Sequence, residues 1–245
     1  MNGPLWSEME SMLKAYARAG IEVTEKSRNY ARSICWRVQF ISQHRDMIGA
    51  LNWNTFWTAG SFDHQSGKLV STDICLMGGG EVNRLCMQVS CHQMSLCFLY
   101  KWFEDLVSGA VNAQDTLGRL LHSLHRARTL EQQASLGQLR KEMQDDCLFA
   151  KLLDNGSEFQ QLSLLRPIRG ILQHSAFEHV IRRPESNAGE QGVVPVVNSE
   201  IDIGTWATDR RLPAFADQVV KATTGLLGDC VRLLSSDPKN AIIMR

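Results

Sequence analysis

Apolar side chains recur at helical spacing along most of this chain. Between residues 7 and 57 they return every three, four or seven positions, as in helices that bury one face. We expect two helices over 7–57, with a break near Gly20. Six prolines among 245 residues, with none between Pro4 and Pro167, also favour long helices, because proline interrupts the helical hydrogen-bond ladder. The apolar positions are Leu13, Tyr16, Ala17, Ile34, Val38, Ile41 and Ile48.

The middle of the chain predicts two longer helices. A seven-residue apolar repeat from Glu81 to about Ser108 is typical of a central core helix. Asp115 is suited to cap a second helix, which we expect from Thr116 to about Leu153. The apolar positions of the two helices are, in order, Leu85, Val89, Leu96, Leu99, Phe103 and Leu106, and then Leu117, Leu120, Leu121, Leu124, Leu136, Leu139 and Met143.

The last part of the chain predicts two further helices separated by a loop. Asn155-Gly156 is typical of a helix end, and the capping-box pattern Ser157–Gln160 is expected to open a helix that continues to about Ser175. A long surface loop near 184–208 follows. The final helix is expected from Leu212 to Leu234. Its inward stripe is Phe215, Val219, Ala222, Leu226 and Val231.

Glycines interrupt the helical pattern near residues 58–80. A brief extended run at Lys68–Val70 and the triplet Gly78–Gly80 predict a loop or small hairpin. The triplet lacks the lysine and hydroxyl residue of a phosphate-binding P-loop, so a linker is favoured. We therefore predict an all-α helical bundle in which 1–245 form a single domain, with N-terminal helices over 7–57 and a helical core over about 81–235.

The charge balance restricts the possible ligands. The chain has 26 basic and 26 acidic residues and a formal net charge of zero, with 44% apolar residues, which is ordinary for a soluble globular protein. Proteins that bind nucleic acid by bulk charge are usually strongly basic. If this chain contacts RNA or DNA, a local basic patch must make the contact.

Cysteine usage and the lack of targeting segments favour a cytoplasmic protein. The seven cysteines form no Cys-x-x-Cys pair, and Cys86, Cys91 and Cys97 do not share one helix face, so neither a disulfide framework nor a metal site is expected. The N-terminus has no basic segment followed by an apolar run. Polar residues interrupt the apolar window 85–103, which argues against a membrane span. We expect no cofactor.

One pair of residues has a sequence context that suggests chemistry. Arg169 and His174 form an Arg-x4-His pair in the expected 157–175 helix, before the long loop and the final helix. Two other Arg and His pairs at similar spacing, Arg37…His44 and Arg119…His125, lack this context and are interpreted as coincidence. The arrangement resembles that of HEPN domains, helical modules whose Arg-x4–6-His motif lies in the penultimate helix. Gly170 stands where that family commonly has a polar residue.

The resemblance implies a metal-independent endoribonuclease that is a homodimer with a composite site. The function that it suggests is that of a toxin or anti-phage effector held inactive by an antitoxin or regulatory partner. His174 is then the general acid or base, and Arg169 stabilises the charge on the phosphate in the transition state. Five helical residues separate the two by about 140°, on opposite margins of the apolar stripe. Two copies facing each other across a two-fold axis would bring such margins together.

Further basic residues are candidates for RNA binding near this pair. Arg166, Arg182 and Arg183 are expected to contact RNA, and Arg210-Arg211 lies beyond the loop. Glu104 and Asp105 are candidates for orienting Arg169 or His174. The alternative hypothesis is a non-catalytic interaction or regulatory module that uses the same helix as a dimer or partner interface. A small-molecule site lined by the tryptophans has no support beyond their number.

Overall fold

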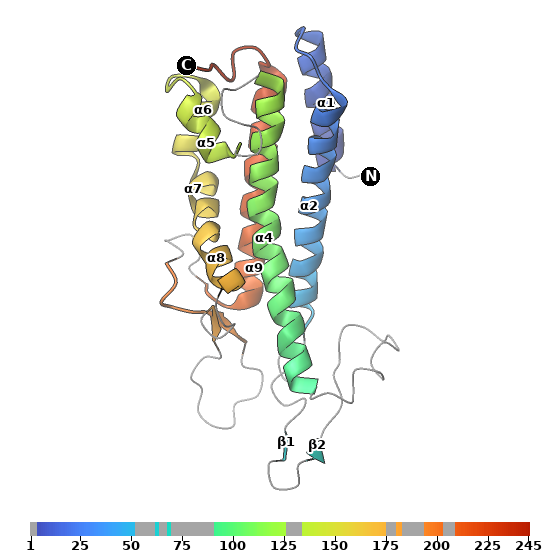
Figure 1. The fold of residues 1–245 in the computed structure, drawn as a ribbon, viewed down its shortest axis with the longest axis vertical. Coiled ribbons are helices and arrows are strands. Elements are labelled where there is room, and N and C mark those ends of the chain that lie inside the picture. Colours follow the sequence, from blue (N-terminus) through green and yellow to red (C-terminus); the bar gives the residue numbers. More distant parts are fainter. Residues whose placement is uncertain are drawn as a thin grey trace. The chain divides into compact units, whose positions relative to one another are not determined.

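The structure is a computed structural model that describes residues 4–51, 62–63, 68–69, 91–125, 134–174, 180–182, 194–202 and 209–245 (Figure 1), and of 62–63, 68–69, 91–98 and 182 only the backbone. The described chain is mostly helical, which confirms the all-α prediction. Its helices are α1 Pro4–Arg18, α2 Glu25–Gly49, α4 Cys91–His125, α5 Leu136–Glu142, α6 Leu148–Asn155, α7 Ser157–Ser163, α8 Leu165–His174 and α9 Leu212–Ser236.

The backbone groups into two compact units. The first unit comprises Met1–Ile41, Ser108–Arg166 and Val219–Arg245, and the second comprises Ser42–Val107 and Pro167–Gln218.

The two N-terminal helices and the break between them are as predicted. Gly20 has a positive φ of 81°, a conformation that glycine adopts without steric cost. The backbone N–H groups of Gly20 and Ile21 donate to the carbonyls of Ala17 and Tyr16 at 3.1 and 3.0 Å, so unpaired carbonyls at the end of α1 are satisfied.

Helices α2 and α4 run antiparallel in a defined register in the first unit. The hydroxyls of Ser27 and Ser123 are 3.0 Å apart. A Cβ added at Gly109 would lie 2.5 Å from Cγ2 of Ile41, so the missing side chain of Gly109 lets the helices approach. These two contacts are fourteen residues apart on both helices. Residue Arg37 is therefore level with Ala113.

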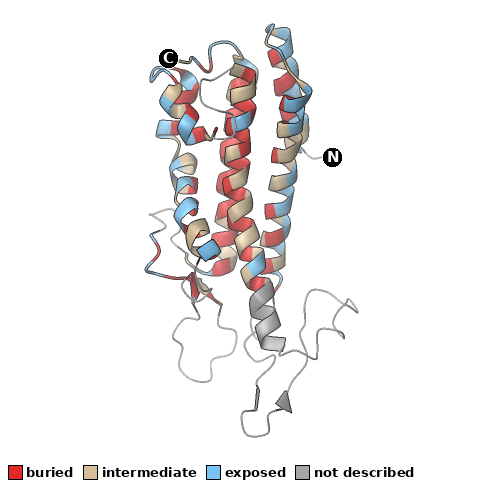
Figure 2. Cartoon of the chain, viewed as in Figure 1, coloured by how far each residue is buried: buried red, intermediate tan, exposed pale blue. Residues whose placement is uncertain are grey.

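The prediction that Asp115 caps a new helix is wrong. Helix α4 continues through this residue from Cys91 to His125, and the Asp115 carboxylate accepts hydrogen bonds from Arg166 of α8. Figure 2 shows buried residues along much of α4. Its predicted apolar positions from Leu99 onward are buried: Leu99, Phe103, Leu106, Leu117, Leu120, Leu121 and Leu124. The positions 85, 89 and 96 lie outside the residues whose side chains are described.

The predicted helix over 116–153 is also wrong, because α5 and α6 occupy its second half as separate short helices. Ser135 caps α5 by accepting a hydrogen bond from the backbone N–H of Gln138 at 3.2 Å. The predicted end at Asn155-Gly156 is confirmed by α6, whose last residue is Asn155. The apolar positions Leu136, Leu139 and Met143 are buried as predicted.

The helix predicted over 157–175 is divided into α7 and α8 at Leu164. Pro167 has no N–H to donate to the carbonyl of Ser163, four residues earlier, and its ring would clash with that carbonyl in a continuous helix. The predicted capping box is wrong as well: Gly156 is the N-cap, and the side chain of Gln160 donates to the carbonyl of Asp154 at 2.8 Å.

The second unit contains two short antiparallel strand pairs besides its helical segments. Strands β1, Phe62–Asp63, and β2, Lys68–Leu69, form the small hairpin expected near 58–80. The triplet Gly78–Gly80 lies outside the described residues. Within the loop expected near 184–208, β4, Val196–Val197, pairs with β3, Ile181–Arg182.

Helix α9 begins at the predicted Leu212 and extends two residues beyond the expected end, to Ser236. All five residues of its predicted stripe are buried.

Candidate functional site

The last two turns of α8 carry the predicted catalytic pair in the second unit. Leu165, Ile168 and Leu172 are buried, whereas Arg169 is half-buried and His174 is exposed. The two candidate residues therefore lie outside the buried stripe. His174 is the last residue of α8, so its imidazole lies at the end of a helix and is accessible to solvent.

Tyr100 of α4 holds this turn in place. Its phenol donates a hydrogen bond to the backbone carbonyl of Leu172, one of the last four carbonyls of α8, which have no partner within the helix. Burial, followed by the charge of Glu104, raises the pKa of Tyr100, while Lys101 opposes this shift. The phenol therefore keeps the proton that it donates. This contact restrains the backbone two residues before His174.

The two acidic candidates for orienting Arg169 or His174 have other partners. Asp105 lies 2.8 Å from Nζ of Lys101 and 3.7 Å from Nε2 of His44, and Glu104 lies 3.3 Å from the same lysine. His44 is buried. Glu104 and Asp105 thus belong to a cluster with Lys101 and His44.

Of the three residues predicted to bind RNA, the structure describes the side chain of Arg166, which lies on α8 one helical turn before Arg169. Arg166 belongs to the first unit and pairs with Asp115. Arg182 lies in β3 with its side chain undescribed, and Arg183 lies outside the described residues.

The neighbouring arginine pair is engaged in local contacts. Nη1 of Arg210 donates to the backbone carbonyls of Asn198 and Ile201 at 2.7 and 3.2 Å, which fixes the segment after β4. Arg211 pairs with Asp209.

Sequence reasoning missed a group of arginines in the first unit. Arg166 of α8 reaches Asp115 on α4, and Arg119 is one helical turn beyond Asp115 on the same face. The register of α2 and α4 places Arg37 beside them. We call Arg37, Arg119, Arg166 and Asp115 the open cluster. Burial, then the charge of Arg119, lowers the pKa of Arg37, and Asp115 partly offsets this effect.

Neither of the other two Arg and His pairs, Arg37…His44 and Arg119…His125, comes together as a site. His44 pairs with Asp105, and His125 lies beside Tyr16. Arg37 and Arg119 instead come together with each other. No local sequence signal could have found this cluster, because three separate helices contribute to it.

The first unit contains a pair of ionisable groups that contact each other. The Tyr16 hydroxyl and Nε2 of His125 are 2.9 Å apart. Burial lowers the pKa of His125 to about 4 and raises that of Tyr16, so both are neutral at pH 7. Ser123, which hydrogen-bonds to Ser27, lines a cavity in the same unit. The cavity has a volume of about 250 Å³ and is lined by Gly20, Ile21, Glu22, Thr24, Ser123 and Leu124.

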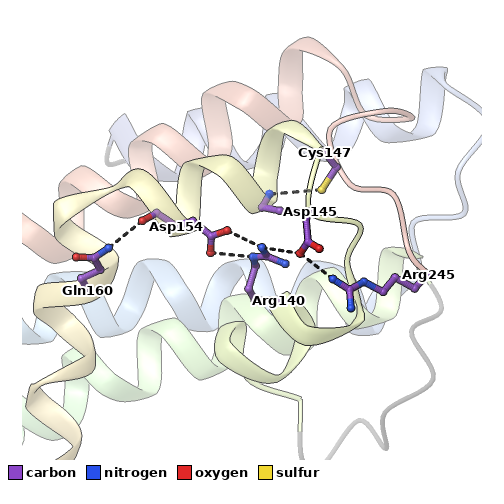
Figure 3. A network of polar contacts seen from close by, with 7 residues as sticks. Arg140, Asp145, Cys147, Asp154, Gln160 and Arg245 are labelled. Carbon is purple, nitrogen blue, oxygen red and sulfur yellow. Dashed lines mark hydrogen bonds and ion pairs between the residues drawn. The ribbon is translucent and has the colours of Figure 1, made fainter.

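A second arginine group in the first unit is fully paired with carboxylates (Figure 3). Arg140 donates to Asp154 at 2.5 and 2.9 Å and to Asp145 at 2.9 Å, and Asp145 also accepts from Arg245 at 2.7 Å. We call Arg140, Asp145, Asp154 and Arg245 the closed cluster. It attaches the C-terminal segment to α5 and α6, where the backbone N–H of Arg245 donates to the carbonyl of Glu142 at 2.8 Å.

Within the described ranges, no three or more His, Cys, Asp or Glu residues are arranged to hold a metal ion. Among the helices described, none is long and apolar enough to cross a membrane.

Comparisons with known proteins give no identification. No protein family, no curated protein and no solved structure matches this chain. The geometry of its own residues therefore carries the functional argument.

Proposed function

We propose that the chain is a metal-independent endoribonuclease of the HEPN type that acts as a homodimer through Arg169 and His174. The observation that carries this proposal is the placement of both residues on α8, outside its buried stripe, with the exposed His174 in a turn anchored by Tyr100. The order of elements agrees, because α8 is followed by the 184–208 segment and then by the final long helix α9.

The chemistry assigned to these residues is cleavage of RNA by its own 2′-hydroxyl. His174 accepts the proton of the 2′-hydroxyl as that oxygen attacks the adjacent phosphorus, or donates a proton to the departing 5′-oxygen. Arg169 stabilises the negative charge that develops on the phosphate oxygens. The products are a 2′,3′-cyclic phosphate and a 5′-hydroxyl end. A strand without 2′-hydroxyls cannot react in this way.

We propose a dimer because two side chains on one helix at this spacing do not point to the same place. Five residues separate Arg169 from His174 by about 140° around the axis and about 7.5 Å along it. A second copy of α8 across a two-fold axis would supply the complementary margin. A regulatory partner that covers α8 would keep such an enzyme inactive.

The decisive test is cleavage of a mixed-sequence RNA in EDTA by the wild type, by His174→Ala and by Gln173→Ala. Gln173 is the exposed neighbour of His174 and serves as the matched control. We expect loss of at least 100-fold in rate for His174→Ala, normal cleavage by Gln173→Ala, and no cleavage of the same strand with 2′-O-methyl groups.

Equal cleavage by His174→Ala and the wild type would refute the assignment, as would a strictly monomeric active protein in size-exclusion chromatography. If no variant cleaves RNA while α8 still mediates dimerisation, the non-catalytic interaction module is the better description.

A further inference from the structure

The open cluster has an excess of positive charge close to exposed aromatic side chains. It contains three guanidinium groups and one carboxylate, and that carboxylate is already engaged by Arg166. Arg119 is exposed, and the side chain of Arg166 is 41% exposed. Like charges held together in a protein favour the binding of an anion that neutralises them.

The backbone register shows why the arginines meet. Arg37 is level with Ala113, so Asp115 lies about 3 Å and Arg119 about 9 Å further along α4. Side chains on a helix lean toward its N-terminus. Because α2 and α4 are antiparallel, the side chains of Arg37 and Arg119 lean toward each other.

Arg37 has unused hydrogen-bonding capacity. Its Nε atom is buried, and it has no hydrogen-bond partner in the part of the chain that the structure describes. A guanidinium group offers a planar fork of donors that matches two oxygens of a phosphate group. A phosphate placed between Arg37 and Arg119 would receive hydrogen bonds and reduce their mutual repulsion.

Two large aromatic side chains lie near Arg37 on α2. Trp36 and Phe40 are each 52% exposed, although such side chains are usually well covered. They are four residues apart and share one face of α2, and Phe40 lies between Trp36 and Arg37 around the helix axis. Exposed aromatic rings beside cationic groups are the arrangement with which proteins bind single strands, since each base can stack on a ring while the phosphates contact arginines.

We propose that Trp36, Arg37, Phe40, Arg119 and Arg166 form a binding surface for single-stranded nucleic acid. The guanidinium groups bind the phosphates, and the aromatic rings stack on the bases. All five residues belong to the first unit, and neither Arg169 nor His174 is among them, so the existence of the surface does not depend on cleavage. It also explains how a chain of zero net charge can bind a polyanion through a local patch.

The test measures the fluorescence anisotropy of a labelled mixed-sequence 12-mer, as RNA and as DNA, in EDTA with His174→Ala protein as the parent. Under the proposed function the His174→Ala protein cannot cleave RNA, so the experiment measures binding without cleavage. In this parent we expect Trp36→Ala and Phe40→Ala each to weaken binding roughly 10-fold. The double variant Arg37→Gln/Arg119→Gln should reduce the slope of log affinity against log salt by about 1.4.

Matched controls separate this surface from nonspecific effects. Leu148 is an apolar residue of similar exposure, 49%, away from α2, and Arg232 is an exposed arginine on α9. We expect Leu148→Ala and Arg232→Gln to bind within twofold of the parent. Circular dichroism identifies any unfolded variant. If the half-buried Arg37 is needed for folding, the exposed Arg119→Gln and Trp36→Ala variants decide the result.

The arms of the experiment also identify the ligand. Equal binding of RNA and DNA indicates recognition of bases and phosphates, and tighter binding of RNA adds a contact to the 2′-hydroxyl. Both results support the surface. It is refuted if the parent binds neither strand at low salt, or if Trp36→Ala, Phe40→Ala and Arg119→Gln bind as the controls do. If the wild type binds RNA but does not cleave it, that result would instead count against the proposed function alone.

Discussion

The closed and open clusters use the same residue types to different ends. In the closed cluster two arginines face two aspartates, and hydrogen bonds of 2.5–2.9 Å join Arg140 to its two carboxylates. In the open cluster three arginines face one aspartate, and Nε of Arg37 lacks a partner among the described residues. A balanced set stabilises the chain to which it belongs. An unbalanced set is stabilised by something added from outside.

The position of each cluster in the chain agrees with this difference. The closed cluster holds the C-terminal end of the chain through Arg245. Beside it, the N–H of Gln144 donates to the carbonyl of Ile243 at 2.8 Å. The residues of the open cluster come from the three helices α2, α4 and α8. We therefore expect substitutions around the closed cluster to change stability, and substitutions in the open cluster to change binding.

The largest effect is expected where α5, the support of the closed cluster, packs against α4. A Cβ at Gly118 would lie 2.6 Å from the backbone carbon of Ser135 and 2.8 Å from the nitrogen of Leu136. Backbone atoms cannot move aside as the end of a side chain can. We expect Gly118→Ala to lower the free energy of unfolding by roughly 3–4 kcal/mol in urea titrations.

Gly137 on α5 provides the matched control for this substitution. Nothing lies within 4 Å of a Cβ added there, and the residue is exposed. Because alanine favours helix more than glycine does, Gly137→Ala should leave stability unchanged or raise it by up to about 1 kcal/mol. Equal losses at both positions would contradict the packing of α5 on α4.

The buried helix faces and the open cluster show where sequence reasoning succeeds and where it fails. The buried stripes of α4 and α9 follow from periodicity, because burial on one face repeats with the helical turn. The error at Asp115 arose because aspartate is a favoured helix cap, whereas its actual partner, Arg166, is 51 residues away. Contacts of that kind carry no local signal.

The candidate site was predictable in part for the same reason. The place of Arg169 and His174 outside the buried stripe follows from their spacing within one helix. The anchoring of that turn by Tyr100 comes from another helix and could not be predicted. The break at Leu164, by contrast, was accessible from the sequence, because Pro167 removes the hydrogen bond to Ser163.

Acid tests a third polar group of the first unit, the Tyr16–His125 pair, because the arginines of both clusters stay charged while His125 titrates. Its pKa of about 4 in the folded chain lies below the ordinary 6.5. Well above pH 6.5, His125 is neutral in both the folded and the unfolded chain, so its titration does not reduce the free energy of unfolding there. Between pH 6.5 and 4 the unfolded chain binds the proton more readily, and stability should fall by at most about 3 kcal/mol.

We expect thermal unfolding scans of wild type and His125→Gln to diverge over this pH range, with the variant losing less. The closed cluster should not contribute to this loss, because Arg140 lowers the pKa values of Asp145 and Asp154 below the usual 3.8. Its stabilisation is present above pH 3.8 and is lost only at lower pH. Parallel pH profiles for the two proteins would contradict a buried neutral His125.

The smallest effect tests the comparison most directly, through one arginine from each cluster. Arg140→Gln leaves Asp145 and Asp154 without their shared donor, and we expect it to lower the free energy of unfolding by about 1 kcal/mol. Arg119→Gln removes a repulsive charge beside Arg37 and should raise stability by a few tenths of a kcal/mol at low salt. High salt should abolish that gain, because it screens exposed charges. Urea titrations at low and high ionic strength, without phosphate or nucleic acid, measure both changes. Opposite signs at low salt identify one cluster as a structural clamp and the other as a charge excess that a ligand can neutralise, whereas a loss of stability in Arg119→Gln would make both clusters structural.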